Sequence, residues 1–344
     1  MIQFNNKIDV IIPAYNVPSN ILFRCLASIA FQDIAKDLDV TIIDDASTEQ
    51  NYQEVIEPFK KILNIQIFRL DINKGPGVAR QYGIDNTSNE FITFIDADDT
   101  LNGPFALKAL LDGIKADNGI NQVCAGVFDE VYPPDYINNE IIPYIKSHER
   151  DLIWLFGKIY RRAFLEKYNI RFHSSSRSNE DNGFNTICRL HASPEERIKF
   201  IPIHVYYWHM NLNSITCRNN FEYSFNSGKN NCFYGYIENM IYAIKEARKY
   251  TPNNNNIDTW TLDCMFYIYI YYLECLNVSP QDAEENLKWC KLYYDSVYRE
   301  LEDEIPKDVL AEFHNEAMKQ AYLEDKFLDF IPELNFFEFI NKLR

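Results

Sequence analysis

Phe91-Ile92-Thr93-Phe94-Ile95-Asp96-Ala97-Asp98-Asp99 is the stretch that decides the fold. Its first half is rich in β-branched and aromatic side chains and predicts a short buried strand, which ends in three carboxylates within four positions. Like charges this close repel each other unless they are solvated, protonated or neutralised by a cation. A hard divalent cation takes oxygen ligands and keeps substrate phosphates among them, which indicates phosphate chemistry. The alternative is an acidic turn that only ends a strand.

The first part of the chain alternates between strand and helix patterns. The strand patterns lie at residues 9–12, 39–43, 65–70 and 90–95, and the helical patterns between them lie at 21–31, 52–63 and 77–85. Repeated strand-helix-strand units predict an α/β fold with a mostly parallel, Rossmann-like sheet, flanked by helices and joined by right-handed crossovers.

Polar residues follow each predicted strand. They form the clusters 13–16, 44–47, 71–77 and 96–99. The carboxyl ends of parallel strands meet at one edge of a sheet, and ligands of open α/β sheets bind at that edge. Any one cluster has a simple explanation as a cap or a turn, but four on one edge favour a ligand site.

The rest of the chain changes character twice. Residues 105–221 are mixed, with a helical pattern at 105–115 and a strand pattern at 122–128, whereas residues 222–344 are helical. The helical patterns there lie at 239–250, 259–276, 280–301 and 307–328, with a loop at 251–256. The aromatic run 266–272 is interpreted as helix-packing surface. We therefore predict a domain at 1–221, made of the halves 1–104 and 105–221, and a C-terminal helical domain at 222–344.

Composition restricts the class of protein. The chain has 344 residues, of which 47% are hydrophobic, so it is long and apolar enough for a buried core. A formal charge of -16 makes nucleic acid an unfavourable partner. The eight cysteines form no Cys-x-x-Cys pair, the N-terminus lacks a secretory signal pattern, and the most apolar run is too short to span a bilayer. These features predict a cytoplasmic protein with reduced thiols and no transmembrane segment, leaving peripheral membrane contact open.

Five segments, taken in order, resemble the family 2 glycosyltransferases of the GT-A fold. They are Ile11-Ile12-Pro13-Ala14-Tyr15-Asn16, Ile43-Asp44-Asp45-Ala46-Ser47, Asn73-Lys74-Gly75-Pro76-Gly77-Val78-Ala79-Arg80, Ile95-Asp96-Ala97-Asp98-Asp99 and Asn179-Glu180-Asp181. The resemblance covers about residues 7–220. It implies an inverting enzyme that uses a nucleotide-diphosphate sugar and a divalent metal ion, Mn²⁺ or Mg²⁺.

The resemblance implies a donor site along the predicted sheet edge. A carboxylate at Asp45 can accept the imide N–H of uracil, Arg80 stacks on or hydrogen-bonds the base, and Tyr15 lies beneath the same pocket. A surface salt bridge is the alternative for Arg80 alone. The other residues assigned to the donor are Pro13, Ala14, Lys74, Gly75, Asp96, Ala97 and Asp98.

The acidic turn takes the place of the family's Asp-x-Asp motif. Alternation along an extended strand end puts Asp96 and Asp98 on one side, with the small Ala97 opposite. By resemblance, Asp98 coordinates the metal ion and Asp96 contacts the ribose or a metal-bound water. Asp99 is left open as a second ligand or as the partner of a nearby cation. His209 is a candidate metal ligand or phosphate donor, and structural roles remain the alternative.

The candidate catalytic pair is Glu180-Asp181. By resemblance, Asp181 is the base that takes the proton of the acceptor hydroxyl, and Glu180 orients it or binds the acceptor. The competing interpretation is an electrostatic cap at the start of a helix. Trp154 and Lys158 belong to a segment that resembles the acceptor side, and residues 206–209 and 213–216 resemble the segment that closes over the pyrophosphate.

These features predict a metal-dependent, inverting glycosyltransferase of the hexosyl- or N-acetylhexosaminyltransferase type. The donor is a UDP-sugar and the acceptor a hydroxyl of a saccharide or other glycan-like molecule. A nucleotidyltransferase is disfavoured because residues 13–16 are not a basic glycine-rich loop. A non-catalytic sugar-nucleotide or carbohydrate-binding protein is the other alternative. The helical domain is assigned no single role among shaping the acceptor groove, forming a homo-oligomer and docking a partner.

Overall fold

The computed structural model describes residues 7–132, 145–175, 178–210, 231–252, 254–306, 308, 310–312, 315 and 334–344. The strands are β1 (Ile8–Ala14), β2 (Leu38–Asp44), β3 (Asn64–Arg69), β4 (Phe91–Phe94), β5 (Thr100–Leu101), β6 (Asn121–Val131), β7 (Ile145–His148), β8 (Lys158–Arg161) and β9 (Arg197–His209). The helices are α1 (Ser19–Ala30), α2 (Tyr52–Ile56), α3 (Pro76–Asp85), α4 (Ala106–Lys115), α5 (Arg162–Lys167), α6 (Glu180–Leu190), α8 (Cys232–Tyr250), α9 (Asn255–Val278), α10 (Ala283–Tyr293), α11 (Arg299–Glu304) and α13 (Phe336–Leu343). The chain divides into two compact units, Met1–Arg218 and Asn219–Arg344.

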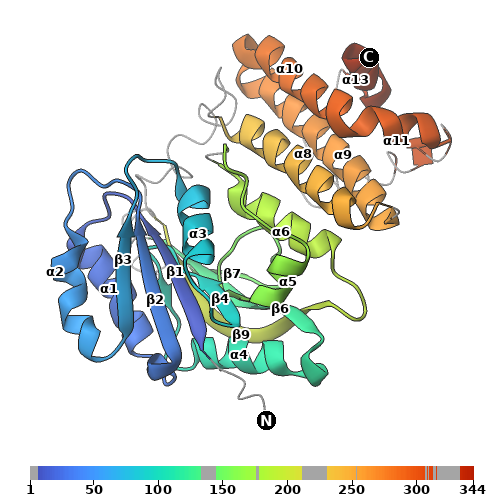
Figure 1. Ribbon diagram of the computed structural model, residues 1–344. Coiled ribbons are helices and arrows are strands. Elements are labelled where there is room, and N and C mark those ends of the chain that lie inside the picture. Colours follow the sequence, from blue (N-terminus) through green and yellow to red (C-terminus); the bar gives the residue numbers. More distant parts are fainter. Residues whose placement is uncertain are drawn as a thin grey trace. The chain divides into compact units, whose positions relative to one another are not determined.

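The described strands of the first unit form one sheet of nine strands, in which β3, β2, β1 and β4 are adjacent and parallel (Figure 1). This part confirms the predicted parallel sheet. Beyond β4, the sheet continues through β8, β6, β9 and β5, and β7 pairs with β6. Of these later pairs only β6 with β9 is parallel, so the complete sheet is mixed.

The parallel part is covered by helices on both faces because successive side chains of a strand point in opposite directions. Ile8, Val10 and Ile12 of β1 belong to one apolar cluster with the buried side chains of α1. The intervening Ile11 meets α3 instead, where a Cβ added to Gly83 would lie 2.5 Å from its Cγ2. Glycine at this position therefore lets α3 approach the sheet closely.

The antiparallel part carries an aromatic core on the α3 side of the sheet. Phe94 of β4 packs edge-to-face on Phe172 and Phe184 at centroid distances of 5.5 and 5.9 Å. Phe184 lies on α6 and also contacts Tyr160 of β8. The opposite face is covered by α4, whose buried Leu107, Leu110 and Ile114 join the α1 cluster. These contacts fix α6 against the end of β4.

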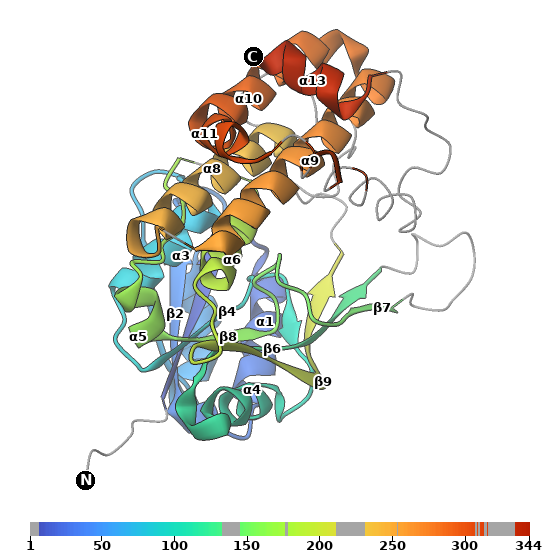
Figure 2. The same cartoon turned by 90° about the vertical axis from the view of Figure 1, so that its right-hand side faces the viewer.

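The second unit is helical, and α8, α9 and α10 run side by side within it (Figure 2). Phe266, Tyr269 and Tyr272 of α9 are buried and contact Phe336 or Phe339 of α13. This confirms the interpretation as packing surface for these three positions of the aromatic run, whereas Tyr267 in the same run is 43% exposed. The pattern at 280–301 contains α10 and a π-helical segment, Tyr294–Tyr298, rather than one regular helix. Most of the predicted helix 307–328 lies outside the described residues.

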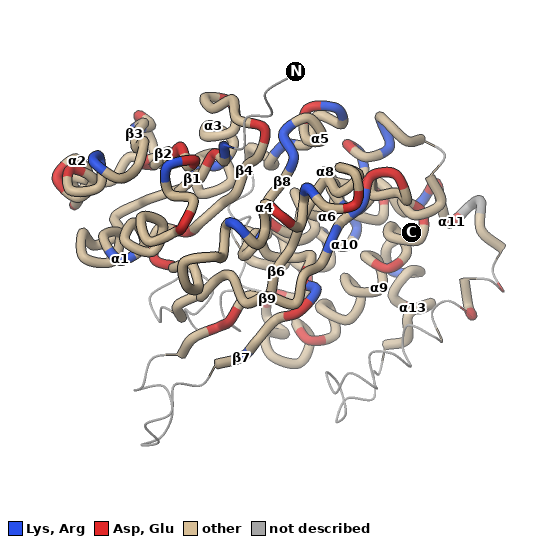
Figure 3. The backbone as a smooth tube through the Cα atoms, turned by 90° about the horizontal axis from the view of Figure 1, so that it is seen from below, with Lys and Arg blue, Asp and Glu red and all other residues tan. Residues whose placement is uncertain are grey.

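Two expectations from composition can be compared with the structure. None of the helices it describes is both long and apolar enough to cross a membrane. The described cysteines are free, and all except Cys232 are buried. Acidic and basic positions are interspersed over the described chain (Figure 3). The predicted domain boundary at 221/222 falls within residues 211–230, which the structure does not describe, and stays a prediction.

The close contact between α3 and β1 predicts the effect of Gly83→Ala. Alanine favours a helix over glycine by roughly 0.5–1 kcal/mol, but the collision with Ile11 costs about 1 to 3 kcal/mol, so the variant should be less stable. Urea unfolding measures this difference. In an Ile11→Ala background the colliding atoms are absent, so Gly83→Ala should lower the free energy of unfolding much less. In an Ile11→Val background, which keeps Cγ2, Gly83→Ala should still lower the free energy of unfolding substantially. Equal costs in all three backgrounds would contradict the packing described.

Candidate active site

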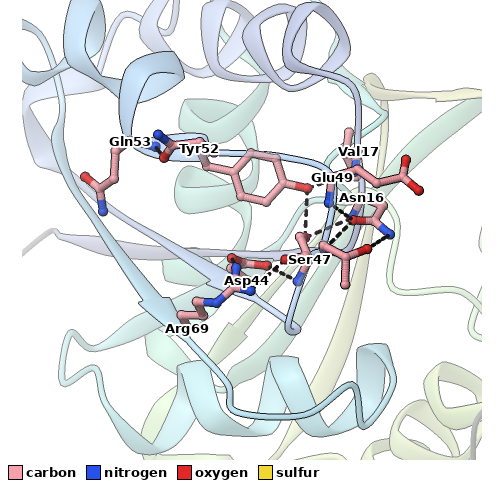
Figure 4. A network of polar contacts seen from close by, with 10 residues as sticks. Asn16, Val17, Asp44, Ser47, Glu49, Tyr52, Gln53 and Arg69 are labelled. Carbon is pink, nitrogen blue, oxygen red and sulfur yellow. Dashed lines mark hydrogen bonds and ion pairs between the residues drawn. The ribbon is translucent and has the colours of Figure 1, made fainter.

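The loops that follow β1 and β2 are held together by a polar network (Figure 4). Asn16 adopts a left-handed conformation, φ 51°, and its side-chain oxygen accepts the backbone N–H groups of Thr48 and Glu49. Its own N–H donates to the Ser47 hydroxyl, and the Tyr52 hydroxyl accepts the N–H of Val17. These loops are therefore fixed before any ligand binds. Beside them the ring of Tyr15 is 49% exposed, whereas Ala14 is buried.

The side chain of Asp45 organises the turn into α3. Its two carboxylate oxygens accept the backbone N–H groups of Lys74 and Gly75, each at 2.8 Å. Gly75 has φ 90° and precedes α3 directly, so the turn needs a residue that tolerates this backbone conformation. Asp45 is buried, while Lys74 is exposed at the same edge. Each oxygen keeps a second lone pair, so the contact with a base N–H proposed for Asp45 stays chemically open.

Arg80 of α3 connects the acidic turn with the start of α6. Its Nη2 donates to Asp96 Oδ1 at 2.6 Å and its Nη1 to Glu180 Oε1 at 2.8 Å. Burial alone would lower the pKa of Arg80, but the charges of Asp96 and Glu180 outweigh it and raise the pKa. Gly77 permits the approach, because a Cβ there would lie 2.9 Å from Glu180 Cγ. The structure thus places Arg80 between two carboxylates instead of on the surface.

Glu180 and Asp181 have different surroundings although they are neighbours at the start of α6. Glu180 is buried and paired with Arg80, whereas Asp181 is partly exposed and forms no ion pair with the described residues. Burial and the charge of Glu180 raise the pKa of Asp181 to about 7. A general base works best with a pKa near the working pH, so Asp181 has both the access and the basicity that the role requires.

The acidic turn is anchored through Asp99. This carboxylate is buried and accepts hydrogen bonds from the Tyr206 hydroxyl at 2.7 Å and from the His209 N–H at 2.8 Å. The Tyr206 hydroxyl in turn accepts the N–H of Asp96 at 3.1 Å. Burial, followed by the charges of Asp98 and Asp96, raises the pKa of Asp99 well above its usual value. Asp99 therefore ties the end of β9 to the acidic turn, a role outside the two alternatives left open by the sequence.

The residues predicted to hold a divalent ion are Asp98 and His209. Among the described residues, no group of three or more His, Cys, Asp or Glu side chains could hold a metal, so an ion here would need oxygen atoms from a bound phosphate as well. Asp98 is partly exposed. Burial, and then the charge of Arg24, lower the pKa of His209 to about 4, so its ring is neutral at physiological pH. A carboxylate and a neutral imidazole suit Mn²⁺ or Mg²⁺ chemistry.

The loop before β8, residues 151–157, is held by hydrogen bonds from the buried side chain of Lys158. Lys158 is only 1% exposed, and its ammonium group donates to Trp154 O at 2.6 Å, Asp151 Oδ1 at 3.3 Å and Phe156 O at 3.4 Å. Asn185 of α6 donates to Trp154 O as well, at 2.9 Å. Direct contact between Lys158 and an acceptor is not what the structure shows, because its donors are used within its own loop. Trp154 is partly exposed and stacks on Phe156.

Several parts of this arrangement were not predicted from the sequence. The roles of Asn16, Tyr206, Asn185 and Arg24 carry no local pattern, because each depends on partners far away in the chain. Of these, only Asn16 and Tyr206 lie in segments that the resemblance had marked. The predicted segment 213–216 and residues 176–177 of the polar loop 173–179 lie outside the described residues.

Known proteins share this sequence pattern and fold. The family model "Glycosyl transferase family 2" matches residues 9–179. The poly(ribitol-phosphate) beta-N-acetylglucosaminyltransferase TarS of Staphylococcus aureus is 32% identical over 215 residues, which is 59% of this chain but 35% of TarS. An N-acetylglucosaminyltransferase of Bradyrhizobium is 35% identical over 106 residues, 30% of this chain and 67% of that protein.

A solved structure extends the likeness in fold to nearly the whole chain. The crystal structure of residues 1–349 of S. aureus TarS in complex with UDP-GlcNAc has a TM-score of 0.65 and 19% identity, and the match covers 94% of each chain. At this level of identity the comparison supports the fold alone, and that fold is GT-A with a helical C-terminal region. The chain spans about a third of the length of TarS, the first of its curated relatives.

The raised pKa of Asp181 predicts how its replacement affects stability. Between pH 3.8 and about 7 the folded protein holds a proton on Asp181 that the unfolded chain has lost, so wild-type stability falls as pH rises through this window. Asp181→Asn has no carboxyl group to titrate at this position, so this loss of stability with rising pH is absent in the variant. Its melting temperature should therefore exceed that of wild type by a margin that grows from pH 4 and levels off above pH 7, at roughly 2 to 5 °C.

Asp37→Asn, the same change at an exposed aspartate, is the matched control and should show no such margin. A difference between Asp181→Asn and wild type that does not depend on pH, measured by thermal melts from pH 4 to 8.5, would exclude a carboxylate with a raised pKa at this position.

Proposed function

This chain belongs to glycosyl transferase family 2, and we propose that it is a metal-dependent, inverting glycosyltransferase. In this proposal it moves a hexose or N-acetylhexosamine from a UDP-sugar to a hydroxyl of a glycan-like acceptor. The observation that carries the proposal is the buried Arg80, which holds Asp96 of the Asp-x-Asp turn beside the Glu180-Asp181 pair. In this proposal Arg80 links the donor turn to the catalytic pair.

The donor side is assigned to the carboxyl edge of β1, β2 and β4. The exposed ring of Tyr15 offers a stacking surface for a base, and Asp45 offers a carboxylate next to the Lys74 backbone. Pro13, Ala14, Gly75 and Ala97 are assigned to the same donor side as small or rigid residues of the loops at this edge. Because Arg80 is occupied by two carboxylates, its part in donor binding is to hold Asp96, and base contact falls to its neighbours.

The leaving group is a nucleoside diphosphate, whose developing charge must be neutralised as the glycosidic bond breaks. Asp98 and His209 would hold the divalent ion that supplies this neutralisation. Asp99 contributes indirectly, because it fixes the His209 backbone next to the acidic turn at 2.8 Å.

The acceptor side is assigned to Asp181 and Trp154. Direct displacement requires a base opposite the leaving group, and Asp181 takes the acceptor proton as the oxygen attacks the anomeric carbon. Glu180 keeps this base in place while Arg80 balances its charge. The ring of Trp154 offers a sugar-stacking surface. Lys158 and Asn185 fix the backbone of this residue by donating to its carbonyl oxygen.

The choice of sugar and acceptor is supported by the relatives. Two of them are named N-acetylglucosaminyltransferases, so UDP-N-acetylglucosamine is the first donor to test. TarS is named for a beta linkage to poly(ribitol-phosphate), and inversion of an α-linked nucleotide sugar gives a β product. A polyol or sugar hydroxyl on a phosphate-containing polymer is accordingly the first class of acceptor to test.

Turnover of a UDP-sugar tests the proposal directly. Wild type incubated with UDP-N-acetylglucosamine, UDP-glucose or UDP-galactose and Mn²⁺ should release UDP slowly without acceptor and faster with one. Asp181→Asn should bind the donor with wild-type affinity and lose transfer by at least about a hundredfold, since general base catalysis contributes that much. Asp98→Ala should lose the metal-dependent part of donor affinity instead.

Asp37→Asn serves as the control in both assays and should behave as wild type. If no nucleotide sugar binds, either with or without metal, the proposal is wrong. Binding without turnover in wild type favours the non-catalytic alternative, and full activity of Asp181→Asn removes this residue from the mechanism.

The buried position of Lys158 predicts a selective defect in acceptor use. Lys158→Met removes the donors that hold Trp154 O and Phe156 O but preserves most of the side-chain volume. A loosened platform should raise the KM for acceptor on the order of tenfold or more, because small displacements of a positioning group are costly. The dissociation constant for UDP should stay as in wild type.

Steady-state kinetics with varied acceptor, together with calorimetric titration of UDP, makes this comparison. Lys108→Met, which removes an exposed lysine on α4, is the control and should change neither value. An unchanged acceptor KM for Lys158→Met would show that the loop keeps its geometry without the ammonium group.

A further inference from the structure

Arg24 lies beside the acidic turn without belonging to any motif. It is an exposed residue of α1, and its Nη2 donates to the Asp98 carbonyl oxygen at 2.5 Å. Two other residues of the same helix contact this segment: the Cys25 thiol lies 3.6 Å from Asp96 O, and Ser28 Oγ accepts the Leu101 N–H at 3.1 Å. One side of α1 therefore runs along the backbone of the turn and holds Arg24 next to Asp98.

The charge of Arg24 is not neutralised by a carboxylate. Several other arginines of this unit form ion pairs, for example Arg80 with Asp96 and Arg69 with Asp44. Arg24 forms no ion pair with the described residues, and its one hydrogen bond there goes to a neutral carbonyl. Its guanidinium lies at the backbone of Asp98, the residue that the proposed function assigns to the metal-bound diphosphate. A guanidinium with unused donors thus stands among the groups assigned to the diphosphate.

We propose that Arg24 is a phosphate-binding residue of this site. A guanidinium has five N–H donors in a planar fork that matches two phosphate oxygens, and one hydrogen bond to a carbonyl leaves most of the fork available. The carbonyl of Asp98 orients the fork, so the side chain loses less freedom on binding. The inference rests on the proposed function and adds a cation that the family resemblance did not assign.

The phosphate has two possible sources with the same chemistry. It belongs either to the diphosphate of the donor or to a phosphate group of the acceptor. The two sources predict different ligands for Arg24, so binding measurements separate them. A purely structural role, in which Arg24 only tethers the turn, predicts equal effects on every ligand, including ligands without phosphate.

The test compares Arg24→Gln and Arg24→Lys with wild type. Glutamine keeps a donor for the Asp98 carbonyl but removes the charge, whereas lysine keeps the charge but removes the fork. Arg197→Gln is the matched control, because Arg197 is also an exposed arginine with a hydrogen bond to a backbone carbonyl, that of Pro194, at 3.0 Å. Thermal melts establish that each variant is folded.

Calorimetric or NMR titrations use UDP, uridine, ribitol 5-phosphate and ribitol in the presence of Mn²⁺. Arg24→Gln should weaken UDP about tenfold, or weaken ribitol 5-phosphate by a similar factor if the acceptor supplies the phosphate, and should leave uridine and ribitol unchanged. Arg24→Lys should recover part of the loss, and Arg197→Gln should match wild type.

Unchanged affinity for both phosphate ligands in Arg24→Gln overturns the inference. Equal losses for uridine and UDP overturn it too, because they indicate a tether. If wild type binds no UDP but prefers ribitol 5-phosphate to ribitol through Arg24, the proposed function fails and the inference stands. If wild type shows no preference for either phosphate ligand, both fail.

Discussion

The buried guanidinium of Arg80 is the interaction on which the site depends. It joins Asp96, which follows β4, to Glu180, which opens α6, although Glu180 lies 100 residues away from Arg80 in the sequence. Removing one partner of a buried ion pair typically costs 3–5 kcal/mol, because the remaining charge stays desolvated. Here one cation serves two carboxylates. The acidic turn and the start of α6 therefore cannot separate without leaving a buried charge unpaired.

A second set of contacts connects the acidic turn to strand β9. Asp99 is the most buried carboxylate of the turn, and it receives its two hydrogen bonds from β9, a strand more than a hundred residues further along the chain. Tyr206 extends the connection to the Asp96 backbone. The three carboxylates of the turn therefore have different surroundings. Asp96 is paired with Arg80, Asp99 is buried, and Asp98 is partly exposed. This difference answers the question of how like charges persist so close together.

The sequence was sufficient where structure follows from local pattern. The parallel direction of β1 to β4 and the position of the polar clusters after these strands follow from alternation of strand and helix, and the structure confirms them. The roles of Arg80 and Asp99 could not be predicted, because their partners Glu180, Tyr206 and His209 lie a hundred or more residues further along the chain. Lys158 illustrates the limit: its motif suggested a binding residue, but the carbonyls of its own loop occupy it.

The same long-range contacts explain why Asp181 is suited to act as a base. A carboxylate at the start of a helix would ordinarily be favoured in its charged form by the helix dipole. Burial and the adjacent Glu180 oppose this and raise the pKa to about 7, while the charge of Arg80 limits the increase. Because Arg80 is shared with Asp96, the basicity of Asp181 is linked to the state of the donor turn. The charge of Asp96 also raises the pKa of Asp181. A ligand that neutralises Asp96 would therefore lower the pKa of Asp181 and favour its ionised form. In the proposed function, a bound donor that neutralises Asp96 would have this effect on the base.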